Sequence, residues 1–558
     1  MKKIFSGVLF LVFSGFIVSC GNQTTTETKD EKTDTIQAST NNEMKKKVEE
    51  YAVVELKTDL SVLSEAQKKM LPLLIEAAQI MDDIYKKEVY SGDYEALRNS
   101  LPDEYTKQFF DINYGPWERL NGNKSFVESI NEKPLGSGFY PSDMTKEEFE
   151  AFENDTKTGL YTMIVRNEEG QLESIPYHEY FKEETDKAAK LIKQAAELAE
   201  DEGLKKYLEL RVEALMNDDY YESDVAWMEM KNNIIDFVVG PIETYEDQMF
   251  GYKAAHESFI LVKDKEWSNK LDKFAALLPQ FQKDLPVEEK YKNETPGSDS
   301  DLGAYDAIYY AGDCNAGSKT IAINLPNDEK VRLDKGSRKL QLKNSMRAKF
   351  ERILVPISDL LISEDQRKHV KFDAFFENTM FHEVAHGLGM GNTVDGSATV
   401  REALKEYYTS IEEGKADILG LFIVTKLYEM EELNSGELMD NFVTFMAGIF
   451  RSVRFGATSS HGKANMMRFY YFEEAGAFVR DEATGTYKVD FEKMKEAMNA
   501  LTEKILIIQG DGDYEAAKAW VEKDGQIKEA LQKDLDRVNN AGIPRDIVFK
   551  QGPEVLGL

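Results

Sequence analysis

Two histidines lie four residues apart in the segment His382-Glu383-Val384-Ala385-His386. On a helix, residues four apart share one face, so both imidazoles can bind the same metal ion. Glu383 lies next to the first histidine, where its carboxylate can take a proton from a metal-activated water. The spacing predicts a metal-dependent hydrolytic site; the alternative is a helix that carries two unrelated histidines.

A group of acidic residues follows in the segment Glu412-Glu413-Gly414-Lys415-Ala416-Asp417. Glu413 and Asp417 are four apart, which is the spacing of a third ligand and a supporting carboxylate in zinc sites built from two histidines and a glutamate. We expect Asp417 and Glu412 each to hold the second ring nitrogen of one histidine. The alternative for this segment is a solvated acidic helix face.

Together the two segments predict one zinc ion bound by His382, His386 and Glu413, with Glu383 as the base. Two imidazoles and one carboxylate could also hold iron. Such iron sites do not keep a glutamate next to the first histidine as a base, so zinc is the better prediction.

The elements that must position these residues are helices. Apolar residues have helical spacing from about 348 to 433. The same spacing predicts helices within 44–87, 180–216, 264–286, 438–455, 463–478 and 491–508. Zones rich in β-branched and aromatic residues predict strands within 227–263 and 307–325, and a polar stretch predicts a loop at 294–301.

The length of 558 residues exceeds the size at which one hydrophobic core stops growing, so two lobes are expected. We predict an α+β fold with two lobes around a cleft. Residues 44–350 would form a mixed lobe with a β-barrel-like core, and 351–558 a mostly helical zinc-bearing catalytic lobe. Segment 264–300 is a candidate for packing with the catalytic lobe.

The first residues have the pattern of a targeting signal. Lys2 and Lys3 precede a short apolar run that ends at Cys20, which resembles a bacterial lipoprotein signal. We expect a signal peptide at 1–19, lipid modification of Cys20 and a polar tether at 20–43, which would anchor the protein in the bacterial cell envelope. An ordinary secretory peptide is the alternative. Cys314 would then have no disulfide partner and is expected to be a buried thiol.

The net charge of −32 repels phosphate backbones and anionic headgroups. Nucleic acid is therefore not expected as a partner, and contact with a membrane is expected only through the anchor. The acidic surface could attract cationic ligands such as the amino end of a peptide, or could serve only solubility.

Several separated segments between about 225 and 475 resemble the dipeptidyl-peptidase III family of zinc metallopeptidases. Residues 412–417 are similar to that family's second zinc motif. The resemblance implies roles for residues in three further segments, 240–245, 324–327 and 459–462. It implies that Glu243, Asn324 and Asn327 bind the peptide's terminal ammonium, and that Tyr245 and His461 contact the scissile carbonyl as it gains charge. Each of these residues could instead be a plain strand, turn or capping residue.

Two departures from the family are visible. The family has H-E-x-x-G-H, whereas this chain has the five-residue form with Gly387 after the second histidine, which a regular helix accommodates. An arginine that the family carries shortly after its histidine is replaced by Asn465, so we expect the C-terminal side of the substrate to be held differently here. Residues 313–317 and 461–465 are more similar to a Nudix-associated branch, although the chain has no Nudix box.

The predicted function is a zinc peptidase that releases dipeptides from short peptides with a free N-terminus. The alternatives are another zinc endopeptidase or aminopeptidase, and a surface lipoprotein that binds peptides around a structural zinc. Product lengths separate the peptidases. A structural site would need a fourth protein ligand and would have no use for Glu383.

Overall fold

The computed structural model describes residues 42–296, 300–433 and 435–558. The predicted signal peptide, Cys20 and the tether up to residue 41 lie outside the described residues. The described chain begins with a helical segment at 42–49. Within these described ranges, no helix combines the length and the apolar character needed to cross a membrane.

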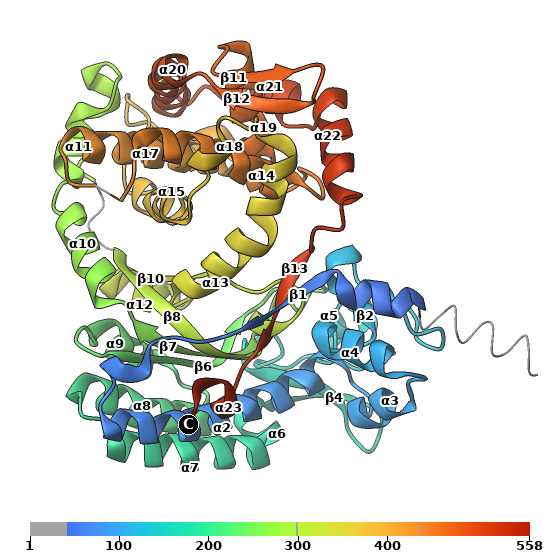
Figure 1. Cartoon of the computed structure of the whole chain (residues 1–558). Coiled ribbons are helices and arrows are strands. Elements are labelled where there is room, and N and C mark those ends of the chain that lie inside the picture. The colour runs from blue at the N-terminus through green and yellow to red at the C-terminus, as the bar shows by residue number, and fades with distance from the viewer. Residues whose placement is uncertain (1–41, 297–299, 434) are drawn as a thin grey trace, which may run out of the picture.

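An open five-stranded sheet forms the middle of the lower half of the molecule in Figure 1. The strand order is β6-β7-β8-β10-β9, and neighbours are antiparallel except β8 and β10. The strands are β6 (Ile235–Glu243), β7 (Ala255–Lys263), β8 (Ser300–Gly312), β9 (Ala322–Leu325) and β10 (Ser337–Leu342). β6 and β7 are buried along most of their length, and the buried part of β7 includes the polar residues His256, Glu257 and Ser258.

The described residues do not show a closed barrel. Closing a barrel requires the two edge strands to pair. Among the described residues no ladder joins β6 to β9, and β9 has only four residues. Helix α2 (Glu65–Val89) packs against β7 and β8, and α7 (Lys182–Leu198) and α8 (Glu202–Asn217) lie with it below the sheet in Figure 1. The result is a sheet covered by helices on one face.

The upper half in Figure 1 is mostly helical. Its central helix is α17 (Tyr408–Glu429), which is buried around most of its circumference, as expected for a helix inside a core. Four helices pack around it: α15 (Phe372–Ala385), α18 (Leu438–Val453), α19 (Ser460–Glu474) and α20 (Phe491–Gly510). α15 and α17 make the most extensive of these contacts, and they carry the two segments with metal-ligand spacing.

Two large clusters of buried apolar residues form the cores, one around the helices of the upper half and one around the sheet and α2. α10 (Lys265–Ala275) and α11 (Leu278–Asp284) contribute to the upper core: Trp267 packs edge-on against Phe376, and Phe274 lies beside Phe381. Segment 264–285 therefore packs with the helices that follow it in the chain.

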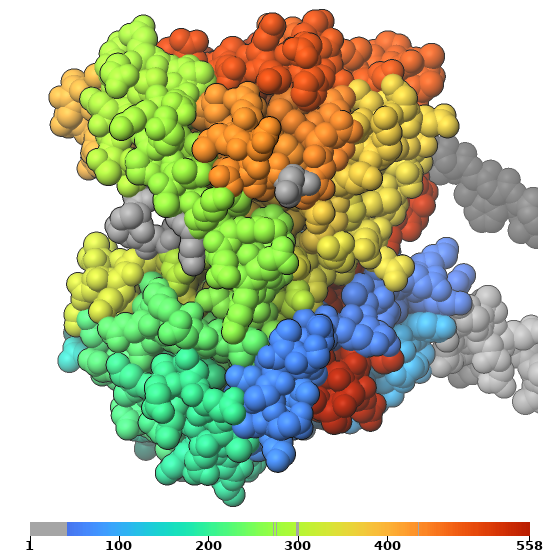
Figure 2. All heavy atoms as spheres, turned by 60° about the vertical axis from the view of Figure 1, so that its left-hand side comes forward, coloured from blue at the N-terminus to red at the C-terminus, as the bar shows by residue number. Residues whose placement is uncertain are grey.

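The C-terminal end returns to the lower half. β13 (Asp546–Lys550) pairs in parallel with β1 (Tyr51–Glu55), and Phe549 stacks on Tyr310 of the sheet. In Figure 2 the red C-terminal end accordingly lies against the blue N-terminal segment. The predicted helical lobe, 351–558, includes β13, whereas in the structure β13 pairs with β1 of the lower half. The two strands are almost five hundred residues apart in the sequence.

The remaining elements connect and cover these two halves. In the lower half they are α3 (Tyr94–Ser100), α4 (Glu104–Asn113), β2 (Trp117–Glu118), β3 (Lys124–Ser125), α5 (Lys146–Ala151), β4 (Thr162–Arg166), β5 (Leu172–Pro176), α6 (Tyr177–Tyr180), α9 (Tyr221–Glu229), α12 (Glu329–Lys335) and α23 (Pro553–Leu556). From β10 onward they are α13 (Lys343–Lys349), α14 (Val355–Leu361), α16 (Val400–Leu404), β11 (Phe478–Asp481), β12 (Thr486–Val489), α21 (Tyr514–Asp524) and α22 (Glu529–Asn539).

Candidate metal centre and active site

Helices α15 and α17 bring the two sequence segments together. A glycine in α17 permits their close approach: a Cβ added at Gly420 would lie 2.8 Å from the backbone nitrogen of His382. Real Cβ atoms do not make so short a contact, so any larger residue would force the helices apart. Gly420 was not singled out from the sequence, because its effect depends on which helix lies opposite.

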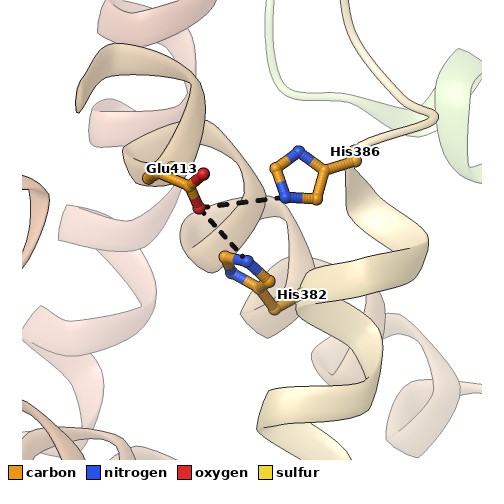
Figure 3. Close-up of side chains that lie close together, drawn as sticks. All are labelled: His382, His386 and Glu413. Atoms are coloured by element: carbon orange, nitrogen blue, oxygen red, sulfur yellow. Dashed lines mark ion pairs between the residues drawn. The ribbon is translucent and has the colours of Figure 1, made fainter. Parts of the chain in front are cut away.

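His382, His386 and Glu413 converge on one point (Figure 3). The Oε2 atom of Glu413 lies 3.4 Å from Nε2 of His382 and 3.9 Å from Nε2 of His386. The three potential ligand atoms lie within 4.8 Å of one another. One carboxylate oxygen and two imidazole nitrogens thus face a common centre, as three protein ligands of a catalytic zinc do.

The other ring nitrogens are held as the sequence predicts. Nδ1 of His382 lies 2.7 Å from Oδ1 of Asp417, and Nδ1 of His386 lies 2.9 Å from Oε1 of Glu412. A carboxylate at Nδ1 keeps the proton on that nitrogen and leaves Nε2 with a free lone pair. Both imidazoles are therefore oriented to bind a metal through Nε2.

A metal ion fits this arrangement because the cluster leaves one buried oxygen without a partner. Oε2 of Glu413 is buried and makes no hydrogen bond to the described residues. A buried carboxylate oxygen without a partner is costly, and a cation at the convergence point would remove that cost. Two nitrogens and one oxygen are also a donor set that zinc accepts.

The electrostatics of the cluster favour positive charge at its centre. Burial opposes ionisation of Glu412, but Lys415 and His386 lower its pKa to about 2. Burial likewise opposes ionisation of Asp417, and Arg468 and His382 lower the pKa to about 2. Burial would lower the pKa of His382, yet the neighbouring carboxylates raise it to about 10. The site therefore binds a cation readily, whether a proton or a metal ion.

Three supporting residues were not singled out from the sequence. Arg468 of α19, fully buried, pairs with Asp417. Gln509 of α20 donates to Oε2 of Glu412 at 2.9 Å, and Lys415 lies 2.8 Å from Oε1 of the same carboxylate. Lys415 could have been noticed, because it stands three residues after Glu412 on one helix face. Arg468 and Gln509 reach the site only through tertiary packing.

Glu383 and His461 lie next to the three converging residues. Nδ1 of His461 is 3.1 Å from Oε2 of Glu413, outside hydrogen-bonding geometry, and the side chain of His461 is largely exposed. Glu383 follows His382 on α15 and is paired with Lys339 of β10, whose Nζ lies 3.2 Å from Oε2 of Glu383. No local pattern in the sequence indicated a role for this lysine.

Asn465 does not point to an open site. Its side chain donates to the carbonyl of His461 at 2.9 Å and to Oγ of Ser452 at 2.9 Å, and it accepts from Nη2 of Arg468 at 2.9 Å. It therefore acts as an internal support for α19, and the nearby arginine is turned inward to Asp417.

The residues expected at the peptide's amino end lie on the two edge strands of the sheet, β6 and β9, and on the segments that follow them. Nδ2 of Asn327 donates to the carbonyl of Ile242 at 3.0 Å, which brings Asn327 beside the end of β6. Burial raises the pKa of Glu243, and Asn327 lowers it in part. Tyr245 is 76% exposed, and the charge of Glu243 raises its pKa. Asn324 lies nearby on β9.

The metal-site residues lie on helices α15 and α17, and the amino-end candidates lie on β6, β9 and the segments that follow them. Lys339 connects them, because it pairs with Asn324 in the β9–β10 register and reaches Glu383. Cys314 is buried in the sheet core with its pKa raised by burial, so it is not placed as a nucleophile.

Comparison with known proteins identifies the class. Residues 150–399 match the model of "Peptidase family M49". The solved structure of DPP III from Caldithrix abyssi superposes with a TM-score of 0.87 at 42% identity, covering 92% of this chain and 99% of that one. The dipeptidyl-peptidase III structure from Corallococcus sp. strain EGB gives 0.74 at 36% identity, over 91% and 96% of the two chains.

Two sequence relatives are also similar to this chain. "Nudix hydrolase 3" of Arabidopsis thaliana is 36% identical, over 90% of this chain and 73% of that protein. "Dipeptidyl peptidase 3" of Homo sapiens is 31% identical over 121 residues, 21% of this chain and 15% of that one. The chain belongs to peptidase family M49, the dipeptidyl-peptidase III family, and is a metallopeptidase.

Proposed function

We propose that this protein is a zinc-dependent dipeptidyl peptidase that releases dipeptides from the amino end of short peptides. One observation carries the proposal: Oε2 of Glu413 is buried, has no hydrogen-bond partner and faces the Nε2 atoms of His382 and His386. Membership of family M49 and the likeness to two dipeptidyl-peptidase III structures support it.

His382, His386 and Glu413 would hold the zinc ion. When bound, zinc would lower the pKa of a water and polarise the scissile carbonyl. Three protein ligands leave a position open for water and substrate, whereas a structural site would be closed by a fourth. Asp417 and Glu412 keep both imidazoles oriented, and Arg468 and Lys415 keep those carboxylates ionised.

Glu383 is the general base in this proposal. Its carboxylate takes a proton from the attacking water and passes it to the leaving amine. His461 stands next to Glu413, where it can donate a hydrogen bond to the carbonyl oxygen as negative charge develops. Tyr245 would provide a second donor to the same oxygen.

Glu243, Asn324 and Asn327 would bind the terminal ammonium. A half-buried carboxylate and two amide oxygens are suitable acceptors for its three N–H donors. A fixed distance from this group to the zinc ligands would make the cut fall after the second residue.

We further propose that the substrate lies in a cleft between two lobes, one built around the sheet and one around α15 and α17. Closure of these lobes on the peptide would cover the exposed side chain of Tyr245 and exclude water from the site. From the sequence of the first twenty residues we also propose a lipid anchor at Cys20 in a bacterial cell envelope.

Mass spectrometry of the products from defined short peptides tests the function. Zinc-loaded protein should release N-terminal dipeptides stepwise, and N-acetylation of the peptides should prevent release. Glu383→Ala should lower turnover by about 10²–10⁴-fold with zinc still bound. Internal or single-residue cuts would favour a different zinc peptidase. Zinc binding without cleavage would favour a peptide-binding protein.

A further inference from the structure

Lys339 lies at the boundary between the sheet and the zinc-site helices. It belongs to β10, its side chain is 11% exposed, and its Nζ lies 3.2 Å from Oε2 of Glu383 and 3.0 Å from the backbone carbonyl of the same residue. A single ammonium group therefore contacts both the side chain and the main chain of the residue expected to act as the base.

The carbonyl contact is explained by the end of helix α15. The helix ends at Ala385, and the amide of Gly387, which would be the donor to Glu383 in a longer helix, bonds to the carbonyl of Val384. The last carbonyls of a helix lack partners within the helix and favour cations. Lys339 donates a hydrogen bond to the carbonyl of Glu383, and Lys415 donates to the carbonyls of His386 and Leu388.

Capping of the helix end would require only the contact of Lys339 to the carbonyl of Glu383, and not its contact to the carboxylate of the same residue. An ammonium that binds a residue's own carbonyl and carboxylate restricts the side-chain rotamer of that residue. Two flexible methylene groups join the carboxylate of Glu383 to its main chain, so such a restraint decides where the carboxylate lies. Misplacing a catalytic group by about 1 Å costs on the order of 10²-fold in rate.

The strand that carries Lys339 also borders the amino-end group. Lys339 stands opposite Asn324 in the antiparallel β9–β10 register. Directly opposed residues project from the same face of a sheet, so Lys339 and Asn324 face the same side. The position of the base is thereby coupled to the strand pair expected to hold the substrate's ammonium.

We propose that Lys339 is a positioning residue that holds the carboxylate of Glu383 and fixes its distance from the amino-end group. The inference rests on the proposed peptidase function. It assigns Lys339 no contact with substrate, and predicts an effect on the rate of the bound complex more than on binding.

The test compares Lys339→Met and Lys339→Arg with a matched control, Lys349→Met. Lys349 is a buried lysine of α13 whose Nζ lies 2.9 Å from Oδ1 of Asp546. For Lys339→Met we expect kcat to fall about 10–100-fold with KM changed less than about twofold and zinc content unchanged. Lys339→Arg should restore most of kcat, since it keeps the charge. Lys349→Met should lower the melting temperature and keep kcat.

Amide hydrogen exchange provides a readout apart from activity. Exchange over 383–389 should be faster in Lys339→Met than in the wild type, and unchanged in Lys349→Met. A wild-type kcat in Lys339→Met, a loss confined to KM, or an arginine variant no better than methionine would overturn the inference. Unchanged exchange would overturn it even without turnover data. A wild-type protein that cleaves no peptide would instead refute the proposed function.

Discussion

Two buried clusters of charged residues, one in each half of the molecule, differ in how their carboxylates are satisfied. In the lower half, Glu246 is 3% exposed and its two oxygens lie 2.8 Å from Nη1 of Arg119 and 2.6 Å from Nζ of Lys133. Ser137 also donates to Oε1 of Glu246 at 2.7 Å. In the upper half, Oε2 of Glu413 makes no hydrogen bond among the described residues, and imidazole nitrogens of His382, His386 and His461 lie 3.1–3.9 Å from it.

The difference separates a structural cluster from one that binds a ligand. Around Glu246, cationic side chains neutralise the carboxylate and hold its pKa at about 2 against the effect of burial. Around Glu413 the carboxylate oxygen Oε2, which makes no hydrogen bond among the described residues, faces two imidazole nitrogens, and a cation between them would neutralise it. Perturbed pKa values occur in both clusters, so they alone do not identify the functional one. The functional cluster is identified by Oε2 of Glu413, which makes no hydrogen bond among the described residues and converges with ring nitrogens of His382 and His386.

The largest expected effect is loss of the metal. Glu413→Gln, or a chelator, should abolish peptide turnover, because two imidazoles alone hold zinc weakly. The zinc content of the purified variant, measured by mass spectrometry of the metal, should fall well below one per chain. The helices should remain folded, since packing and not metal forms this core, and circular dichroism checks that. Full turnover in zinc-free protein would contradict the account.

The corresponding change in the lower cluster should affect stability and not chemistry. Glu246→Gln leaves two buried cations without their carboxylate and should lower the free energy of unfolding by about 3–5 kcal/mol. Turnover per folded molecule should stay near the wild-type value. Denaturant titration and kinetics below the unfolding transition measure the two effects. A large fall in kcat would show that this cluster takes part in the reaction.

The same variant makes a pH prediction. The folded-state pKa of Glu246, about 2, lies below its ordinary value of 4.5. The unfolded chain therefore binds the proton more tightly than the folded chain. The stabilisation that ionised Glu246 contributes is complete above about pH 4.5 and is lost as the pH falls toward 2. The melting temperature of Glu246→Gln should consequently depend less on pH in that window. Equal slopes for both proteins would contradict the assigned pairing.

A smaller effect is expected one step away from the metal ligands. Asp417→Asn keeps the shape of the side chain but weakens its hold on Nδ1 of His382, and should reduce zinc affinity about 10–100-fold. Competition with a zinc-binding dye measures this. Asp440→Asn is the matched control, since Asp440 makes the same contact to Nδ1 of His369 at 2.7 Å outside the site. The zinc affinity of Asp440→Asn should equal that of the wild type.

The smallest predicted effect concerns helix packing. Gly420→Ala should destabilise the protein by about 1–3 kcal/mol and lower zinc occupancy, because its Cβ would meet the backbone of His382. Gly448→Ala in α18 is the control: a Cβ there meets nothing within 4 Å, and alanine favours the helix. Equal stability of both variants would show that the close approach of α15 and α17 is not required.

The sequence predicted the parts of the site that depend on short-range geometry. His382 and His386, and Glu413 and Asp417, are four apart on helices, so spacing alone places each pair on one face. Most helices and the strands β6 to β9 were also predicted from periodicity. Lys339 and Arg468 were missed because only tertiary packing brings them to Glu383 and Asp417.

Other features of the fold also depend on long-range contacts. Strand alternation identifies strands but does not determine whether the edges of a sheet pair, so the pairing of this sheet's edges could not be read from the sequence. The pairing of β13 with β1 joins the two ends of the described chain and leaves no local signal. The proposed roles of Tyr245 and Asn324 come from family resemblance; in the structure Tyr245 is exposed and Asn324 pairs with Lys339 in the β9–β10 register.

The most direct test of the comparison between the two clusters is anomalous diffraction at the zinc edge from crystals of the zinc-loaded protein. The account predicts one strong peak at about 2.0–2.2 Å from Nε2 of His382, Nε2 of His386 and Oε2 of Glu413, and none beside Glu246. A peak elsewhere, or no peak at Glu413 in protein that cleaves peptides, would contradict the assignment of this cluster as the catalytic metal centre.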